Sequence, residues 1–398
     1  MRISTANAYN ASIESLMERQ TKLADTQEQM TTGKRVNRPS DDPAAAARAE
    51  RAYAAEQRAT ASQRAVDASN NAMTLTESAL GDAGELMQQV REALVSAGNA
   101  SYGDAERLGI ANQLADLRQQ LLAVANRSDG AGNYLFGGQS ASVAPFSDVP
   151  GGVQYQGTAG PTQSASPDPL PLTLDGRAAW TSARSGNGVF ETSAVTSTGS
   201  AWIDSGKVTD PSAVTGATYS IQFSVGGGTT TYSVLKGGVA TAQTNVAFKP
   251  GQAVQVDGLS ASIAGQPANG DVFQMAPASP SLSVFDALDQ AITDLKTPNR
   301  TNTQIAQSSA ANITSVDAVM NQLGAARSQV GATLNRVSAA TDRLSAQKLA
   351  SQTERSNAED LDMTQAISDF SNQQTGYDAA LKAYSMVQRL SLFNYLNG

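Results

Sequence analysis

Large apolar side chains recur at every seventh position in the first part of this 398-residue chain, and this spacing constrains the fold most. The series begins at Val66 and ends at Leu94, with small residues three places after its members. A heptad pattern predicts a long helix that packs along one seam, and small residues let its partners approach closely. The N-terminal flank is therefore expected to build an extended helical bundle.

The sequence also marks where this helix begins and ends. Asp42 suits the N-cap, Pro43 the first helical position and Gly98 the stop. A helix of about 54 residues would be about 80 Å long. After a turn at 98–103, a second apolar series from Arg107 to Val124 predicts a shorter helix that returns antiparallel to the first.

The C-terminal flank mirrors this pattern. Apolar residues from Phe285 to Leu295 open it, and after Pro298 an alternation of three and four continues to Leu344. The phase then slips, and a new register starts at Met363, which predicts a break between two coiled segments. The bundle core predicted from both flanks is Val66, Met73, Leu80, Met87, Leu94, Ile313, Met320, Leu334 and Leu344.

The two end segments, 1–40 and 360–398, have weaker patterns. In segment 1–40, Gln20 and Gln27 occupy heptad core positions, so the segment has little apolar surface to bury. It is therefore expected to be disordered in the free chain. Two interpretations of the N-terminal segment are open. In the simpler one it is a mobile tail; in the other it is a helix that orders only against the C-terminal segment and neighbouring copies. The residues then buried on assembly are Ile13, Leu16, Leu23, Met30, Met363, Phe370, Tyr377, Tyr384, Leu390 and Leu392.

The centre of the chain differs in composition. Residues 133–282 hold 11 of the 14 prolines and 21 of the 33 glycines but only 13 of the 64 charged residues. Period-two alternation over 219–225 and 231–235, around three glycines, predicts a β-hairpin. Further strands are expected at 153–156, 170–174, 246–248, 253–256, 259–264 and 272–275. The predicted fold is α+β: an elongated antiparallel bundle of long helices from both termini, with a β-rich domain inserted where the chain leaves the bundle near Asn133 and returns near Ser281.

The chain contains neither cysteine nor histidine. This excludes disulfides, thiolate metal sites, cysteine nucleophiles and every triad that depends on histidine. Because motifs for nucleotide, phosphate or metal chemistry are also missing from the sequence, we predict a protein that is not an enzyme and needs no cofactor or metal.

Two acidic clusters and two tryptophans have simpler structural explanations. Asp41 and Asp42 suit a helix N-terminus, and the cluster at 359–362 is interpreted as a solvated helix face. Trp180 and Trp202 are expected in the core of a small β domain rather than on a carbohydrate-binding face.

The net charge of −8 and the isoelectric point near 4.8 disfavour binding to nucleic acid or to anionic membranes. The first residues lack the apolar stretch of a secretory signal, and the sequence has no apolar run of the roughly 18 residues that a membrane span needs. If the protein is exported, we therefore expect a route other than general secretion.

Several stretches resemble the bacterial flagellin superfamily and, within it, the hook-filament junction proteins. The N-terminal stretches are MRIST at 1–5, QMTTGKRV at 29–36 and NRPSDDP at 37–43 before a run of alanines. The others are NYLFGG at 133–138, GDVF at 270–273 and LSLFNYL at 390–396. The likeness covers roughly the first 140 and the last 125 residues.

The resemblance implies a structural role in the flagellum. Residues 1–40 and 360–398 would form the axial coil, 41–132 and 285–359 the surrounding helices, and 133–284 the exposed domain. The implied partners are copies of the chain in a ring-like layer, the hook-side junction protein, flagellin and an export chaperone at the C-terminal segment. Export would use the flagellar apparatus without a cleaved signal peptide and place the protein outside the cell. The number of outer subdomains stays open.

Two alternatives share parts of this pattern. Filament flagellin would assemble in the same way, although the stretches at 390–396 and 39–43 fit a junction protein better. A carbohydrate-binding module on a helical stalk belongs to another class of function, and no acid–base pair in the sequence supports a hydrolytic version of it.

Overall fold

The computed structural model describes residues 2–99, 101–140, 142–165 and 168–396, and within these ranges it describes no side chain for residues 2–6, 8 and 387–396. The fold class is α+β as predicted, with long helices from both ends of the chain and a central antiparallel sheet domain. The chain divides into two compact units, Met1–Arg64 with Thr341–Gly398, and Ala65–Ala340.

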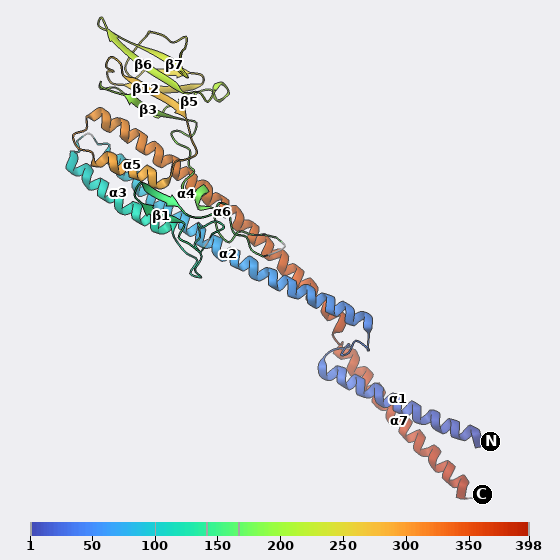
Figure 1. Cartoon of the computed structure of the whole chain (residues 1–398). Coiled ribbons are helices and arrows are strands. Elements are labelled where there is room, and N and C mark those ends of the chain that lie inside the picture. Colours follow the sequence, from blue (N-terminus) through green and yellow to red (C-terminus); the bar gives the residue numbers. More distant parts are fainter. Residues whose placement is uncertain (1, 100, 141, 166–167, 397–398) are drawn as a thin grey trace. The chain divides into compact units, whose positions relative to one another are not determined.

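The first unit is helical. It contains α1 (Arg2–Thr32), the first part of α2 (Pro43–Ala97), the last part of α6 (Asn302–Glu359) and α7 (Met363–Leu396). Helices α1 and α7 lie side by side and run antiparallel (Figure 1). The predicted break in the C-terminal coil is confirmed, because α6 ends at Glu359 and Asp362 caps α7 by accepting the backbone N–H groups of Thr364 and Gln365.

Helix α2 begins and ends where the sequence predicts. The Asp42 carboxylate accepts hydrogen bonds from the backbone N–H groups of Ala44 and Ala45 at 3.1 and 3.0 Å, and Pro43 is the first helical residue. The helix has 55 residues and ends directly before Gly98. The expected N-cap and stop signals are therefore confirmed.

The second unit has a helical core of its own. Helices α3 (Asp104–Ala125) and α5 (Val284–Lys296) contact each other, and their apolar faces share one cluster with those of α2 and α6. Pro298 lies between α5 and α6, as expected of a residue that cannot continue a helix. Leu114 and Leu288 are fully buried in this cluster.

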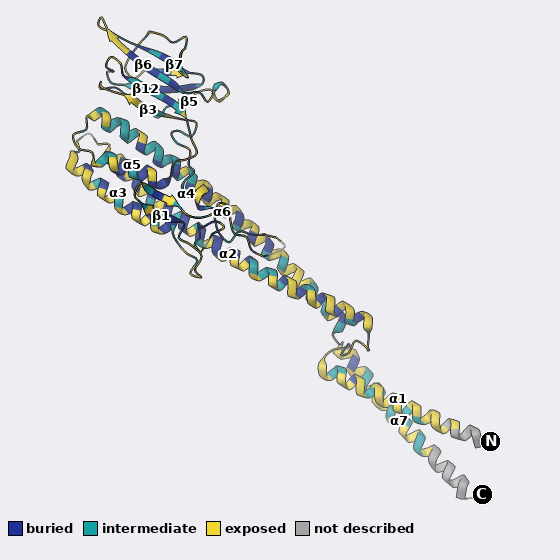
Figure 2. Ribbon diagram, viewed as in Figure 1, coloured by how far each residue is buried: buried dark blue, intermediate teal, exposed yellow. Residues whose placement is uncertain are grey.

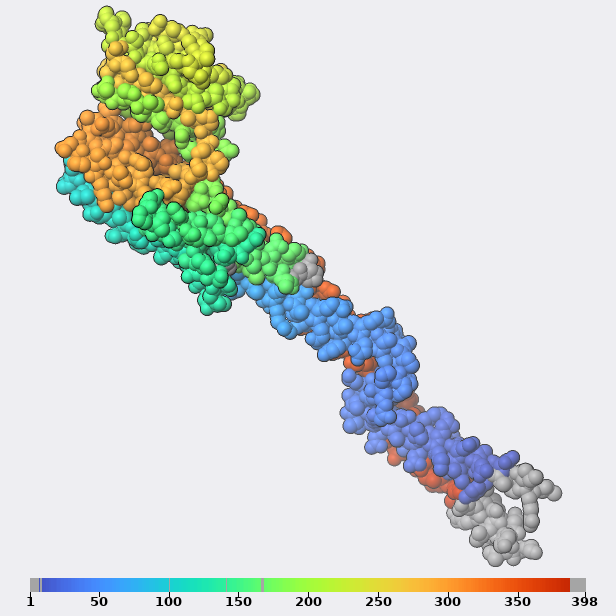
Figure 3. Space-filling model, viewed as in Figure 1, coloured from blue at the N-terminus to red at the C-terminus, as the bar shows by residue number. Residues whose placement is uncertain are grey.

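The first part of the central segment packs onto these helices. Strands β1 (Phe146–Val149) and β2 (Gly152–Tyr155) form a hairpin, and α4 (Gly176–Trp180) follows. Trp180 stacks on Phe285 of α5 with ring centroids 6.1 Å apart and meets Phe136 edge-on. Figure 3 shows this segment in green against the helices. Trp180 is thus a core residue as predicted, but in the core of the helices, because residues 135–183 contribute their apolar side chains there.

Two sheets with a separate core make up the rest of the centre. One has the order β3 (Phe190–Thr196), β12 (Val272–Pro277), β6 (Tyr219–Gly226), β7 (Thr229–Lys236) and β8 (Val239–Ala240), with β9 (Val246–Ala247) also on β7. The other joins β10 (Ala253–Val256), β11 (Leu259–Ala264), β4 (Trp202–Ile203) and β5 (Lys207–Val208). A short 3-10 turn, η1, spans Pro211–Ala213. Phe190, Tyr219, Ile263 and Phe273 are buried between the sheets.

A buried carboxylate ties this sandwich together. Asp271 is fully buried and accepts the backbone N–H groups of Thr198, Gly199 and Ala268 and the hydroxyl of Thr198, at 2.7 to 3.1 Å. Burial alone raises the pKa of Asp271, but these hydrogen bonds outweigh it, so that its pKa lies below the usual value. The loop at 197–199 is therefore fixed to the start of β12.

Most predicted strands are present. The hairpin is confirmed as β6 and β7, with every residue from 219 to 226 paired, and β2, β9, β10, β11 and β12 occupy the other expected places. The strand expected at 170–174 is wrong: this proline-flanked segment makes a single bridge from Pro171 to Gln163. Strand β3 was missed because most of its side chains are exposed, which removes the alternation that marks a half-buried strand.

Candidate assembly site on the terminal helices

Polar contacts join α1 to α7 in register. The hydroxyls of Tyr9 and Tyr384 lie 2.6 Å apart, and their ring centroids are 5.6 Å apart. Towards the other end of the pair, the Thr26 hydroxyl donates to the Gln373 side-chain oxygen at 2.9 Å. The first and last helices of the chain therefore form one antiparallel seam.

The residues predicted to be buried on assembly lie on this pair, and those whose side chains the structure describes are only partly covered within one chain. Met363 is 45% exposed, whereas the side chains of Leu390 and Leu392 lie outside the described residues. A two-helix pair covers one side of each helix, so the rest of its apolar surface stays open. The half-buried members are Ile13, Leu16, Leu23, Met30, Phe370, Tyr377 and Tyr384.

The well-buried residues of the seam are small. Thr26 and Ala366 are 8% and 4% exposed. The sequence pattern placed Gln27 in the core, but Gln27 is exposed and Thr26 takes the position. Thr26 follows Leu23 by three residues and precedes Met30 by four, so the three-four alternation was the signal that identifies it.

Helix α7 also carries a row of exposed apolar residues. Met363, Ile367 and Leu381 share one face of α7, because four and fourteen residues separate them, and all three are more than 40% exposed. On α1, Met17 is 63% exposed. Figure 2 shows how little of α1 and α7 is buried compared with the bundle. Sequence reasoning missed Met17, Ile367 and Leu381, which lie outside the heptad rows it followed.

The stretch between α1 and α2 contacts the break between α6 and α7. The backbone N–H of Arg35 donates to the Glu359 carbonyl at 2.7 Å, and that of Leu361 donates to the Gly33 carbonyl at 3.0 Å. Lys34 forms a salt bridge with Glu359, and the Arg35 guanidinium reaches the Ala358 carbonyl. The stretch that carries the family resemblance thus holds two helix ends together.

This arrangement corrects the interpretation of the second acidic cluster as a solvated helix face. Glu359 pairs with Lys34 and Arg355, Asp360 accepts the Ser356 hydroxyl, and Asp362 caps α7. The sequence predicted the break between the two coiled segments, but not that the carboxylates next to it would bind side chains and backbone groups on both sides of the break.

The first acidic cluster has the capping role that was predicted. Asp41 accepts the backbone N–H groups of Asn37 and Arg38, and Asp42 caps α2. The N–H of Ala45 and the neighbouring Arg35 guanidinium hold the pKa of Asp42 below its usual value. Both carboxylates act on local backbone structure.

The predicted bundle core differs between its two halves. On α2, Val66, Met73, Leu80, Met87 and Leu94 are all at most 2% exposed. On α6, the predicted Ile313, Met320, Leu334 and Leu344 are only half-buried. The fully buried heptad of α6 is Val316, Leu323, Val330 and Val337, which lies three residues further along the chain.

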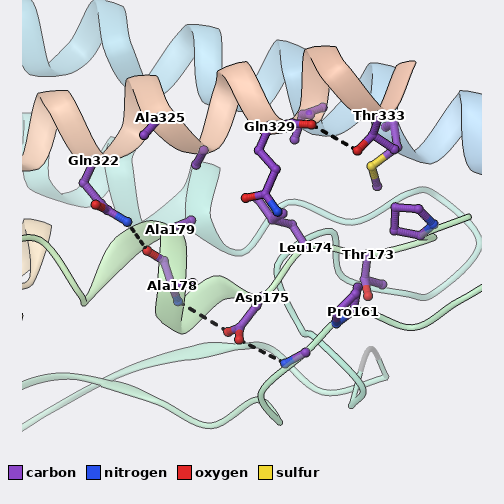
Figure 4. A pocket seen from close by; sticks show the side chains of 15 residues that line it. Pro161, Thr173, Leu174, Asp175, Ala178, Ala179, Gln322, Ala325, Gln329 and Thr333 are labelled. Carbon is purple, nitrogen blue, oxygen red and sulfur yellow. Dashed lines mark hydrogen bonds between the residues drawn. The ribbon is translucent and has the colours of Figure 1, made fainter. Parts of the chain in front are cut away.

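An apolar groove opens on the second unit. It has a volume of about 350 Å³ and runs between α6 and the segment 160–179. Figure 4 shows Gln322 at one end, where its amide donates to the Ala178 carbonyl at 2.6 Å, and Asp175, which caps α4. Its lining is mostly apolar. The hydroxyls of Thr173 and Thr333 donate to backbone carbonyls, and Asp175 caps α4, so these groups act on local structure and form no acid–base pair.

None of the described helices has a stretch long and apolar enough to span a membrane. Among the same residues, no group of three or more acidic side chains is placed to hold a metal ion.

Relatives among characterised proteins match parts of the chain. The flagellar hook-associated protein 3 of Salmonella typhimurium is 36% identical over 152 residues, 38% of this chain and 48% of that protein. That of Escherichia coli is 35% identical over 151 residues. The matched part spans about half the length of these relatives.

Solved structures extend the likeness. The flagellar protein FlgL from Xanthomonas campestris is 29% identical, with a TM-score of 0.68, over 77% of this chain and 99% of that one. Hook-associated protein-3 from Legionella pneumophila shares the fold, with a TM-score of 0.71, 23% identity and coverage of 77% of this chain and 96% of that one.

Two family descriptions match the ends of the chain. The bacterial flagellin N-terminal helical region matches residues 3–141, and the C-terminal helical region matches residues 313–396. Together they cover more than half of the sequence, including the N-terminal helical flank and most of the C-terminal one, and the chain therefore belongs to the bacterial flagellin family.

Proposed function

We propose that this protein is a structural subunit of the bacterial flagellum that joins the hook to the filament and provides the surface on which flagellin polymerises. The observation that carries the proposal is the pair α1 and α7, whose predicted core residues are half-buried in one chain. Apolar surface of this kind favours association with further helices.

The partners are those that a junction subunit contacts. They are copies of this chain in a ring-like layer, the hook-side junction protein below it and flagellin above it. An export chaperone would cover the C-terminal segment before assembly, and the chain would leave the cell through the flagellar apparatus without a cleaved signal peptide. The likeness to hook-associated proteins of about one-third identity supports this set.

Coupled folding is the proposed mechanism of assembly. The ends 1–40 and 360–398 are disordered in the free chain and order when neighbouring copies cover their apolar rows. Hydrogen exchange on a proven monomer tests this step: amides in both ends should exchange fast, and those of the bundle slowly. Strong protection of both ends in the monomer would contradict coupled folding.

Filament flagellin is the second candidate. It is favoured by a 27% identity over 120 residues to the flagellar filament 41 kDa core protein of Borreliella burgdorferi. Deletion of the gene in its own host separates the two candidates. Bare hooks with flagellin lost to the medium establish the junction role, missing filaments without secreted flagellin point to flagellin, and normal filaments overturn both.

A further inference from the structure

Helix α2 carries a row of exposed arginines in the first unit. Arg48, Arg51 and Arg58 lie on one side of the helix, because three and seven residues separate them. Ala55, in the same row, is small, so a neighbouring helix can approach this face closely.

These arginines lack acidic partners in the part of the chain that the structure describes. There, no carboxylate lies within salt-bridge distance of Arg48, Arg51 or Arg58, and Arg51 donates only to the carbonyl of Ala47. By contrast, Arg35 and Arg355 in the same unit are paired with Asp42 and Glu56. In a chain with a net charge of −8, an unpaired basic row is a local exception.

An acidic hollow lies on the other part of α2, in the second unit. Its volume is about 500 Å³, and Glu77, Asp82 and Glu85 line it above two glycines, Gly81 and Gly84. A side chain added at Gly84 would meet nothing within 4 Å, so the hollow has room for a side chain from outside.

The carboxylates of this hollow differ in whether they form salt bridges. Glu77 pairs with Arg327, and Asp82 pairs with Arg127. Glu85 has no salt-bridge partner among the described residues. One heptad further, exposed Glu92 accepts only the amide of Gln88 there.

The two faces match in spacing and in charge. Arg51 and Arg58 are seven residues apart, as are Glu85 and Glu92, so both pairs span about 10.5 Å along the helix. They cannot meet within one chain, because all four residues belong to the same helix and the pairs are separated by about 51 Å of it. A second copy of the chain is the occupant that presents this matching face.

We propose that the arginine row of one copy docks on the acidic hollow of the next copy, with Arg51 and Arg58 opposite Glu85 and Glu92. The contact rests on the proposed function, since it needs copies assembled side by side. Opposite charges at an interface of this kind set partner choice and register more than affinity.

Cysteine cross-linking in isolated flagella tests the contact, because the chain has no cysteine of its own. Ala55→Cys lies between the two arginines, and Gln88→Cys lies between the two glutamates. The two positions are about 50 Å apart along one helix, far beyond the roughly 4.4–6.8 Å between Cα atoms that a disulfide spans. A disulfide between them therefore joins two copies.

The double variant is expected to give a ladder of covalent oligomers on a gel without reductant, and each single variant should stay monomeric. As a matched control, Arg64→Cys, exposed on the other side of α2, combined with Gln88→Cys should give no ladder. If the chain is present in flagella and the Ala55–Gln88 variant gives no ladder, the contact is wrong. If the unmodified chain is missing from flagella, the proposed function fails as well.

Charge reversal tests the chemistry of the same contact. R51E with R58E is expected to lower the amount of the chain in isolated flagella about tenfold, because like charges then face each other. Adding E85R and E92R to that variant should restore the amount. The control R64E with K348E changes the net charge equally at exposed residues and should have no effect. Equal loss in the control, or no rescue, overturns the proposal.

Discussion

The bundle around α2 and the pair of α1 with α7 have the same heptad spacing but different burial. Val66, Met73 and Leu80 on α2 are at most 2% exposed, because α2 shares its core with α3, α5, α6 and the segment 135–183. In the terminal pair, Leu16 and Tyr377 stay half-buried, since in the part of the chain that the structure describes α1 and α7 pack mainly on each other.

Equal heptad spacing therefore does not imply equal burial. The pattern predicts a helix and the side that packs, but the number of neighbours decides how much of that side is covered. A half-covered seam leaves apolar surface that further helices can cover, as an assembly surface requires.

The largest effect is expected from a charge in the bundle. Leu80→Asp buries an unpaired carboxylate among apolar side chains and should unfold the helical part of the second unit, at a cost of more than about 4 kcal/mol. Tyr384→Asp, at a half-buried position of the terminal pair, should leave the monomer's thermal unfolding nearly unchanged and block assembly. Circular dichroism melting of both variants gives the comparison.

A milder bundle variant sharpens this test. Leu334 is half-buried, so Leu334→Asp should destabilise the bundle less than Leu80→Asp does. Equal loss of monomer stability in the Leu80 and Tyr384 variants would mean that the terminal pair is already part of the folded core.

The β sandwich is held together by a buried carboxylate, that of Asp271. Asp271→Ala leaves the N–H groups of Thr198, Gly199 and Ala268 without their acceptor in a buried site. We expect a loss of about 3 kcal/mol in the unfolding free energy of the sandwich. Tryptophan fluorescence at Trp202 follows the sandwich, and Trp180 reports the helical core and should not change.

The sequence predicts the long helices well because their signals are local. Asp42, Pro43 and Gly98 set the ends of α2, and the heptad rows set its buried side. The place of Trp180 was not predictable in this way: its ring packs on Phe285, more than a hundred residues away, and no local pattern specifies that contact.

The candidate site was predicted in part. The heptad rows of α1 and α7 located the seam, but Thr26 was overlooked in favour of Gln27, because strict seven-residue spacing from Ile13 leads to Gln27. The fit of the short Thr26 side chain opposite Gln373 leaves no such pattern in the sequence. The contacts between the stretch at 33–42 and the helix break at 359–362 depend on two segments far apart in the chain, which heptad spacing does not relate.

The ion pairs of Arg118 should make the stability of the bundle depend on pH, which its apolar core does not. The buried Arg118 guanidinium binds Asp148 of β1 through two hydrogen bonds of 2.6 and 3.0 Å and also lies against Asp289 of α5. These hydrogen bonds hold the pKa of Asp148 below its usual value. The stabilisation is therefore complete at neutral pH and is lost as the pH falls below about 3.9 through the lower pKa of the folded state.

Asp148→Asn should remove this contribution. Because the Asp148 side chain is 36% exposed, we expect only about 1 kcal/mol at pH 7, and no difference from the unmodified chain near pH 2. Asp286 acts in the opposite sense: burial, and then repulsion by Asp289, raises its pKa, so that its protonation in mild acid stabilises the fold. Urea unfolding across pH 2 to 7 measures both trends, and a constant difference at every pH would exclude the ionic explanation.

The smallest change in unfolding free energy is expected from an exchange between threonine and valine, which have nearly the same shape, in the terminal seam. Thr26→Val in the terminal seam removes the hydrogen bond to Gln373, worth about 0.5–1.5 kcal/mol, but adds a methyl group to an apolar contact. These terms nearly cancel where the seam is formed, and neither acts while the ends of the free chain are disordered, so the unfolding free energy of the monomer should change by less than about 0.5 kcal/mol. The reverse exchange, Val66→Thr, puts a hydroxyl into a site that is 1% exposed and should cost about 1–3 kcal/mol. If both exchanges cost the same, the terminal seam is as tightly packed as the bundle, and its apolar surface is not reserved for neighbouring copies.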